Sequence, residues 1–349
     1  MAKLKFDLEK GILDYIQKYP NSSSSEIHAG FGKLAAFATI KRTIKALIDK
    51  KFVELSGKGK STRYFISNGL DLLFPIDIAT YFEKEIDDRT IKTGFDFNLI
   101  RGALTEVSLF SNAEMLKLSN LQTIFKENTS KLTEREYNKE FERLAIDLSW
   151  KSSQIEGNTY SLLETEKLLN EKETAAGKTK DEAVMLLNHK EALDFILINP
   201  DYLNPISISP IEDIHSILVG GLGIDRNIRN RRVGISGTNY KPLDNAFQIK
   251  EALEDMCMLI NKRVNVFEKA LLALVLLSYI QPFSDGNKRT ARIISNAILI
   301  DNKYCPISFR TVDSIDYKKA MLVFYEQNNI SAFKKIFIEQ FEFAVNTYF

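Results

Sequence analysis

An apolar run followed by a polar turn constrains the fold of this chain more than any other feature. Residues 270–280 are almost entirely apolar. The run is shorter than the roughly 20 residues that a membrane-spanning helix needs, so it predicts a helix buried in a protein core. Pro282 and the turn sequence Ser284-Asp285-Gly286 end that helix. A second helix is predicted to begin near Gly286, because apolar residues recur at helical spacing from residue 291 to residue 298.

The start of this second helix has the composition of an anion-binding site. The first backbone N–H groups of a helix have no partner within it, and the helix dipole is positive there. Gly286 allows a ligand to approach the main chain closely. Arg289 and Arg292 are three residues apart, so two guanidinium groups on one face could hold a di- or triphosphate. Asp285 could hold a magnesium ion that bridges the phosphates.

A purely structural alternative stays open for the same loop. Asp285 could cap the helix, Gly286 could form the turn, and the two arginines could be surface charge. The loop by itself favours the anion site without excluding this alternative.

The loop also resembles a family signature. The Fic family carries H-x-F-x-[D/E]-G-N-x-R-x-x-R, and the corresponding positions in this chain are Gln281, Phe283, Asp285, Gly286, Asn287, Arg289 and Arg292. All of them fit except the first, where Gln281 stands in place of the family's catalytic histidine. The resemblance covers roughly residues 100–349. It implies a mainly α fold, a Fic-type helical bundle with a small β-hairpin flap.

The resemblance implies transfer of AMP from ATP to a hydroxyl side chain of a target protein. Asp285 would hold Mg²⁺ on the phosphates, and Arg292 would grip the γ-phosphate. The implied nucleotide-binding residues are Gly286, Asn287, Lys288, Arg289, Arg292 and, by analogy, Tyr317. The implied catalytic positions are Gln281, Asp285 and Arg289. ATP, Mg²⁺ and an unidentified target protein are therefore the expected cofactors and partners.

Gln281 conflicts with the implied chemistry. Histidine accepts a proton near neutral pH, whereas a glutamine amide only donates or accepts hydrogen bonds. General-base help is worth about 10²–10⁴ in rate, so we expect a weak or inactive transferase that keeps its nucleotide site. A natural pseudoenzyme, a substituted histidine and a different base all stay open as explanations. Of the three histidines, His28 lies near the N-terminus, and His189 and His215 fall in predicted helices where structural histidines are commoner.

Lys288 is a second departure from the commonest family pattern, which has glycine there. This variant is similar to the motif of death-on-curing toxins, relatives that transfer a phosphate from ATP bound in reverse. Those relatives lack the second arginine, so the presence of Arg292 favours AMP transfer.

Residues 233–242 predict a short β-hairpin with a glycine-bearing turn. The segment looks like the family's flap, with Ile235, Gly237 and Tyr240 as its candidate residues. Such a flap pins an extended target segment by adding it as a strand.

Residues 152–157 resemble the family's inhibitory motif [S/T]-x-x-x-E-[G/N]. Ser152, Glu156 and Gly157 fit it, near the end of a helix predicted over 133–156. By resemblance, Glu156 would form a salt bridge with Arg292 and block the place of the γ-phosphate. Without the resemblance, the same residues describe only a helix end.

Residues 1–70 predict a winged helix-turn-helix. This N-terminal module holds 13 Lys/Arg against 6 Asp/Glu, a charge of +7, whereas the rest of the chain holds 34 against 40, a charge of −6. A third helix over 36–50 could enter a DNA major groove, and the strands near 52–55 and 64–66 would form the wing. The candidate phosphate contacts are Lys41, Arg42, Lys45, Lys58 and Lys60. A protein-binding or dimerisation role, with a homodimer as one outcome, stays open.

The rest of the chain predicts a connecting segment over 71–100 and a helical Fic domain over 101–349, with the inhibitory helix near 133–157. The expected helices cover 101–125, 133–156, 160–172, 179–198, 208–220, 246–262, 266–280, 286–302, 313–327 and 330–347. Two cysteines without a framework, and a start without a signal-peptide core, favour a cytoplasmic protein with no membrane contact. The leading functional hypothesis is an autoinhibited adenylyltransferase scaffold. The alternatives are a DNA-binding transcriptional regulator that senses nucleotide through the Fic body, and a purely structural interaction module.

Overall fold

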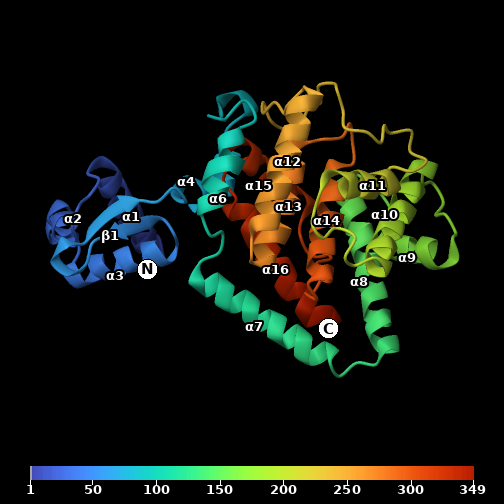
Figure 1. Cartoon of the computed structure of the whole chain (residues 1–349), viewed down its shortest axis with the longest axis horizontal. Helices are drawn as coiled ribbons and strands as arrows, with labels where there is room; N and C mark the ends of the chain where they lie inside the picture. Colours follow the sequence, from blue (N-terminus) through green and yellow to red (C-terminus); the bar gives the residue numbers. More distant parts are fainter. Residues whose placement is uncertain (1) are drawn as a thin grey trace.

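A computed structural model describes residues 2–349, with side chains from residue 8 onward apart from residue 33. The N-terminal module lies at one end of the molecule, and the connecting segment joins it to a larger helical body (Figure 1). Within the described residues, no helix is both long and apolar enough to cross a membrane.

The N-terminal module contains three helices followed by an antiparallel hairpin. Its elements are α1 (Ala2–Lys18), α2 (Ser24–Phe31), α3 (Phe37–Asp49), β1 (Val53–Ser56) and β2 (Arg63–Ile66). Ser23 and Glu26 begin α2 through a capping box. Buried Ile12, Ile16 and Ile40 belong to its core. These elements match the ones that the residue spacing predicts, while the winged-helix assignment and its DNA contacts stay predictions.

The connecting segment contains short helical pieces and is fixed to the body. The pieces are α4 (Leu70–Leu73), α5 (Ile78–Tyr81) and the turn η3 (Ile86–Asp88). The Asn329 side-chain amide donates to the carbonyls of Asp71 and Phe74, at 2.7 and 2.8 Å. The N–H of Ile330 donates to the carbonyl of Leu72 at 2.8 Å. The segment is therefore anchored rather than a free linker.

The body is built from helices beginning at residue 99. Their bounds are η4 (Leu99–Ala103), α6 (Leu104–Glu106), α7 (Asn112–Thr129), α8 (Glu134–Ile155), α9 (Leu162–Glu171), α10 (Lys180–Ile198), α11 (Ile208–Leu218), α12 (Ala246–Lys262), α13 (Val266–Ile280), α14 (Asn287–Asp301), α15 (Ser314–Gln327) and α16 (Ser331–Tyr348). From α8 onward each bound lies within two residues of the predicted one.

The single helix predicted over 101–125 is wrong. The chain leaves the helix after Glu106 and enters α7 only at Asn112. The Glu268 carboxylate accepts the N–H of Leu109 at 2.7 Å and thereby holds the interruption open. Ser111 then begins α7 with a capping box. A buried carboxylate 159 residues away thus overrides the local helical spacing.

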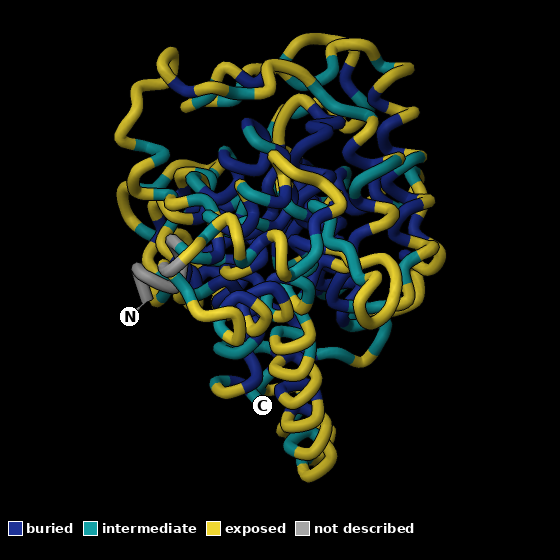
Figure 2. Tube along the Cα trace, turned by 90° about the vertical axis from the view of Figure 1, so that its left-hand side faces the viewer, coloured by how far each residue is buried: buried dark blue, intermediate teal, exposed yellow. Residues whose placement is uncertain are grey.

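The apolar run forms the centre of the body, as predicted. Every residue from 270 to 280 in α13 is buried, and α13 packs against α12 and α14. Asn265 begins α13 by accepting the N–H of Glu268 at 3.1 Å. Figure 2 shows this buried interior surrounded by exposed outer turns. The loop that ends α13 is therefore held by a rigid core.

Residues 233–242, the flap segment, do not form the predicted hairpin. They contain no strand, and an isolated bridge pairs Lys241 with Gly94 of the connecting segment. The N–H of Lys241 donates to the carbonyl of Thr93 at 2.9 Å. The turn itself is present, because Gly237 has a φ of 88°. The hairpin prediction failed because the Gly237 carbonyl and the Lys241 N–H pair with the connecting segment rather than with the first half of the flap segment.

Candidate functional site

The loop after α13 begins with a left-handed residue, Gln281. Its φ and ψ are 52° and 58°, and its N–H donates to the carbonyl of Leu277 at 3.1 Å. The side-chain amide of Gln281 donates to the carbonyl of Ser278 at 2.6 Å. Arg229 supports the same residue, because its Nε donates to the Gln281 carbonyl at 2.6 Å and its N–H to the Pro282 carbonyl at 2.9 Å. Sequence reasoning missed Arg229, whose role depends on contacts 52 residues away.

Asn287 ties the loop into a closed turn. Its side-chain oxygen accepts the N–H of Phe283 at 2.8 Å. Its amide donates to the carbonyl of Phe283 at 2.8 Å and to the Gln281 side-chain oxygen at 3.0 Å. The Asn287 side chain is thus occupied by the loop, and only its backbone N–H is free for an anion.

The first turn of α14 presents free backbone N–H groups. The first helical hydrogen bond runs from the N–H of Thr290 to the carbonyl of Gly286 at 2.9 Å. In the described structure the N–H groups of Asn287, Lys288 and Arg289 have no partner, and no side chain caps the helix. The Asp285 carboxylate accepts the adjacent N–H of Gly286 at 2.6 Å, so the alternative in which Asp285 caps α14 is wrong.

Both arginines of the loop are buried, which excludes the surface-charge alternative. The Arg289 side chain is 1% exposed, donates to the Leu218 carbonyl at 3.3 Å and lies 3.8 Å from Asp285. The Arg292 side chain is fully buried. The Nε atom of Arg289 and the Nη1 atom of Arg292 are buried without a hydrogen-bond partner. Such unpaired buried donors are costly, because each loses the hydrogen bond that it would make with water.

Glu156 contacts Arg292 as the resemblance implied. One carboxylate oxygen lies 2.9 Å from Nη2 of Arg292, and the other lies 3.4 Å from Nζ of Lys288. Ser152 accepts the Nε–H of Arg292 through its hydroxyl at 2.8 Å and an Nη2–H through its carbonyl at 2.9 Å. Gly157 follows with a φ of 100°, which lets the chain turn away from α8. The salt bridge is confirmed, and the Lys288 contact is an addition that the sequence did not indicate.

Electrostatics keep Glu156 ionised. Burial raises the pKa of its carboxyl, but Arg292 and Lys288 outweigh burial and hold the pKa below its usual range. Glu156 therefore carries its charge at neutral pH.

A cavity of about 360 Å³ opens in front of this turn. Its lining residues come from the end of α8, the flap segment, the loop and α15, and they include Glu156, Ile235, Ser236, Asp285, Lys288 and Lys318. Tyr317 is not among them, because it is fully buried beneath Arg292, whose guanidinium carbon lies 5.3 Å from the ring centroid. Tyr240 is also buried, and its hydroxyl donates to the Tyr279 carbonyl at 3.2 Å. The expected adenine contact of Tyr317 therefore finds no support in its position.

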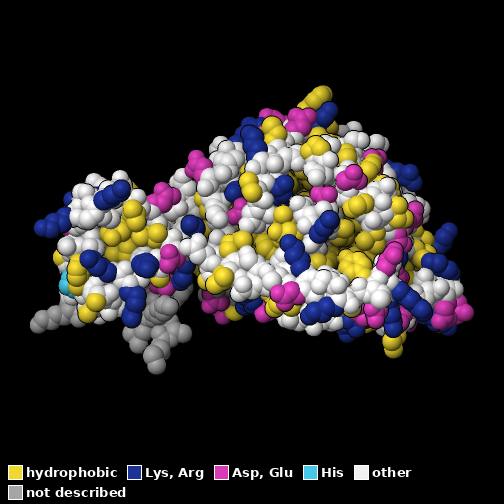
Figure 3. Space-filling model, turned by 60° about the horizontal axis from the view of Figure 1, so that its bottom comes forward, with side chains coloured by type: hydrophobic (Ala, Val, Ile, Leu, Met, Phe, Trp, Pro, Cys, Tyr) yellow, Lys and Arg dark blue, Asp and Glu magenta, His cyan; other side chains and the backbone are white. Residues whose placement is uncertain are grey.

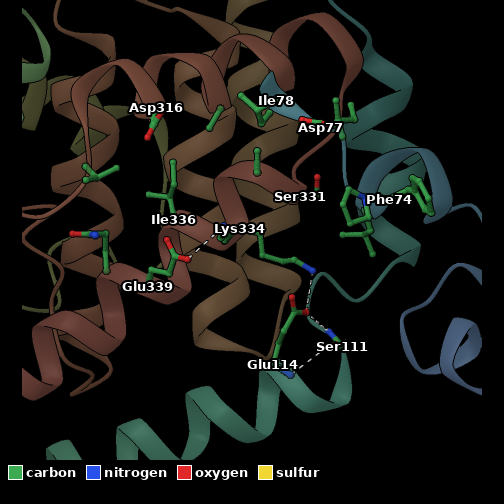
Figure 4. Close-up of a pocket in the computed structure, with 18 of the residues that line it drawn as sticks. Phe74, Asp77, Ile78, Ser111, Glu114, Asp316, Ser331, Lys334, Ile336 and Glu339 are labelled. Atoms are coloured by element: carbon green, nitrogen blue, oxygen red, sulfur yellow. Dashed lines mark hydrogen bonds and ion pairs between the residues drawn. The ribbon is translucent and has the colours of Figure 1, made fainter. Parts of the chain in front are cut away.

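A larger cavity of about 970 Å³ lies between the N-terminal module and the body, away from the loop (Figure 4). Its charged residues are largely paired with each other. Lys334 contacts Glu114 at 2.9 Å and the Leu109 carbonyl at 3.1 Å, and Lys50 contacts Glu9 at 2.7 Å. This cavity offers no converging set of free reactive groups, so the smaller cavity is the better candidate site.

His215, for which the sequence indicated no defined role, lies directly beneath the loop. Its ring stacks on Phe283 with centroids 3.6 Å apart, and Nδ1 lies 3.3 Å from the Thr290 hydroxyl. A Cβ atom on Gly286 would lie 3.2 Å from the ring, so only glycine fits there without displacement. His215 is therefore a packing residue under the loop and is not among the residues that line the cavity.

We expect His215 to make the fold acid-sensitive. Burial lowers the pKa of His215 to about 4, whereas an unfolded histidine titrates near 6.5. The unfolded chain then binds the proton first, so stability is full above about pH 6.5 and falls as the pH approaches 4. Urea unfolding should give roughly 2 kcal/mol less stability at pH 5 than at pH 7 from this residue. His215→Asn should reduce that slope and leave the contribution of His189, whose pKa burial also lowers, while His28→Asn should leave the slope unchanged; equal slopes in all three proteins would contradict the assignment.

Comparison with known proteins identifies the segment that contains the loop. Residues 205–299 match the Fic/DOC family. Protein adenylyltransferase Fic of Nematostella vectensis is 31% identical over 184 residues, which is 48% of this chain and 40% of that protein. Protein adenylyltransferase fic-1 of Caenorhabditis elegans is 27% identical over 176 residues, 48% of this chain and 34% of that protein. The chain thus spans less than half the length of these Fic relatives.

Solved Fic structures share the fold of the body. Fic-1 from C. elegans superposes with a TM-score of 0.57 at 20% identity, over 68% of this chain and 72% of the other. A Fic domain containing signaling protein from Bacteroides thetaiotaomicron gives a TM-score of 0.57 at 20% identity, over 66% and 94%. At this identity the likeness establishes the fold alone.

Proposed function

We propose that this protein is a Fic-type protein adenylyltransferase scaffold, restrained by Glu156 and weak or inactive because Gln281 replaces the family's histidine. One observation carries the proposal. The start of α14, with its free N–H groups, lines the small cavity, and Glu156, which lines the same cavity, forms a salt bridge with the buried Arg292 behind it. An anion at this place would meet the helix dipole and the N–H groups, and displacement of Glu156 would bring it to the Arg292 guanidinium as well.

The residues present fit a nucleotide with Mg²⁺. The free N–H groups of Asn287 and Lys288, at the cavity wall, would gain acceptors from phosphate oxygens, and Arg292 would gain one once Glu156 is released. The Asp285 side chain is 69% exposed at the cavity rim, where it would hold a magnesium ion together with phosphate oxygens and water. Bound ATP would supply the AMP group that the family transfers.

The Glu156 contact supports the restraint. The Glu156 carboxylate already binds the Arg292 guanidinium, to which a γ-phosphate would bind. The negative charge of Glu156 also repels that phosphate. Lys288 adds a second cation on the same carboxylate, so two positive groups hold Glu156 in the cavity. Releasing Glu156 would free both cations for the nucleotide.

The flap segment supports target binding beside the cavity. In the described structure the backbone groups of Val233, Gly234 and Ile235 have no hydrogen-bond partner, and all three residues line the cavity. An extended target segment could pair with this free edge and bring a hydroxyl to the α-phosphate.

Calorimetry and thermal unfolding with ATP and Mg²⁺ test the nucleotide site. We expect Glu156→Gly to bind ATP at least tenfold more tightly than the unchanged chain, because it frees Arg292 and Lys288 from a competing carboxylate. ATP should then raise the Tm of Glu156→Gly more than that of the unchanged chain. Glu339→Gln, which removes a solvent-exposed carboxylate, serves as the control. Absence of ATP binding in every version would refute the proposal.

A second function, DNA binding by the N-terminal module, is favoured by its surface. Lys41, Arg42, Lys45, Lys58 and Lys60 are exposed, and none of them forms an ion pair among the described residues. Figure 3 shows Lys and Arg side chains spread over the visible face of this module. Unpaired cations are available for phosphates, which give affinity without sequence choice.

Duplex DNA binding at increasing salt concentration tests this second function. We expect the affinity to fall steeply with salt, and the triple change Lys41→Gln, Arg42→Gln and Lys45→Gln to lower the slope of log K against log salt by up to about 3. Exchanging three exposed lysines of the body, Lys262, Lys318 and Lys335, for glutamine is the control. Lack of binding even at low salt would remove DNA from the functions of this module.

A further inference from the structure

The flap segment is held from outside by the connecting segment. Asn239 donates its side-chain amide to the Asp87 carboxylate at 2.8 Å. Arg89 donates through Nη2 to the Gly237 carbonyl at 2.9 Å. The Lys241 N–H also donates to the Thr93 carbonyl. Three residues of the flap segment thus each have a hydrogen-bond partner in the connecting segment. The flap therefore owes its position to residues that lie about 150 positions earlier in the chain.

Arg89 is the buried member of this set. Its side chain is 3% exposed and pairs at 3.2 Å with Glu326, whose side chain is 1% exposed. Glu326 lies in the last turn of α15 and also accepts the Tyr81 hydroxyl at 2.5 Å. An ion pair this deeply buried is rigid, because either partner alone would be an uncompensated charge.

Arg89 consequently joins the flap to a wall of the candidate site. Met321 and Leu322 of α15 line the cavity, one turn before Glu326. A Cβ atom on Gly237 would lie 3.2 Å from the Leu322 side chain, so the flap turn rests closely on this helix. Arg89 bonds the turn and the helix at once, and thereby fixes the separation between the free flap edge and the helix wall.

We propose that Arg89 is a positioning residue that fixes the flap over the cavity, so that the connecting segment sets the edge offered to a target peptide. The target-binding role of that edge rests on the proposed function, whereas the placement of the flap does not. Arg89 and Glu326 lie outside residues 205–299, the segment that matches the Fic/DOC family. The parts of the chain that flank the matching segment therefore supply the residues that hold the flap in place.

A spin label on the flap tests the proposal without nucleotide or target. Ser236→Cys offers a selective attachment point, because Ser236 is exposed and the native Cys257 and Cys305 are buried. The test variant is Arg89→Met with Glu326→Met, since replacing both members of a buried ion pair with apolar groups usually preserves folding. The matched control is Arg263→Met with Glu268→Met, another buried pair at 3.1 Å that does not touch the flap.

We expect the mobile fraction of the label to rise several-fold in the Arg89 and Glu326 variant while its Tm stays close to that of the parent. The control should leave the label spectrum unchanged, whatever it does to Tm. Arg89→Lys gives a second variant, which keeps a cation for Glu326 but not the planar fork that also reaches Gly237; its label should also become mobile. An immobile flap in both Arg89 variants, or equal mobilisation in the control, would overturn the proposal. ATP binding measured on the same proteins reports separately on the proposed function.

Discussion

Gln281→His in a chain that also carries Glu156→Gly should raise AMP transfer about 10²–10⁴-fold above Glu156→Gly alone. Position 281 has a left-handed backbone, which histidine adopts more readily than most residues, so the substitution should fold. A histidine there would accept the proton of the attacking target hydroxyl. The hydroxyl oxygen would then bond to the α-phosphorus of ATP, and the bond from that phosphorus to pyrophosphate would break. The Gln281 amide cannot accept that proton.

Four proteins compared with α-labelled ATP give the measurement: the unchanged chain, each single variant and the double variant. Gln281→Ala with Glu156→Gly is the control, because alanine also lacks a base. Label should appear on protein mainly in the double variant. Equal labelling with glutamine, alanine and histidine at position 281 would instead assign the base to another residue. If the double variant bound ATP but labelled no protein, the proposed adenylyltransferase function would be refuted.

Arg292→Met should lower the folding stability of the otherwise unchanged chain by about 3 kcal/mol. Introduced together with Glu156→Gly, the same substitution should abolish ATP binding. The Arg292 guanidinium is fully buried, satisfies the Ser152 hydroxyl and carbonyl, and neutralises Glu156. Methionine fills part of the space but leaves the carbonyl and the carboxylate without their donor. Urea unfolding measures the first loss, and calorimetry with ATP and Mg²⁺ measures the second.

Arg232→Met is the matched control for this substitution. Arg232 pairs with Asp244 at 2.7 Å, but its side chain is 88% exposed, so the pair is worth less than about 1 kcal/mol. If Arg292→Met destabilised the protein no more than Arg232→Met does, the contacts of Arg292 with Ser152 and Glu156 would not contribute to folding stability. If it also left ATP affinity intact, the phosphate assignment would fail.

The helices of the body could be predicted because their signals are local. The side chains of Asn245 and Asn265 accept backbone N–H groups at the starts of α12 and α13. Within each of these helices the apolar residues recur at regular helical spacing. The loop after α13 was predictable for the same reason, since Pro282 and the turn sequence Ser284-Asp285-Gly286 directly follow the apolar run. The Glu156–Arg292 contact needed the family resemblance, because spacing alone does not pair residues 136 positions apart.

The hairpin over 233–242 and the helix over 101–125 failed for a common reason. In each case a distant residue supplies the hydrogen bonds that the local pattern would have used: Thr93 for the flap segment and Glu268 for the break before α7. Lys288 is a milder example, because its contact with Glu156 follows from how α8 meets α14. Such competition between local and distant partners is invisible in a window of sequence.

The sequence by itself determined the buried helix, the turn that ends it and the chemistry of the groups at the start of α14, because caps, breaks and apolar spacing act over a few residues. Only the tertiary structure decided which carboxylate meets Arg292 and which segment holds the flap. The physical reason is that buried charges and unpaired backbone groups accept whichever partner the packed helices bring within hydrogen-bonding distance.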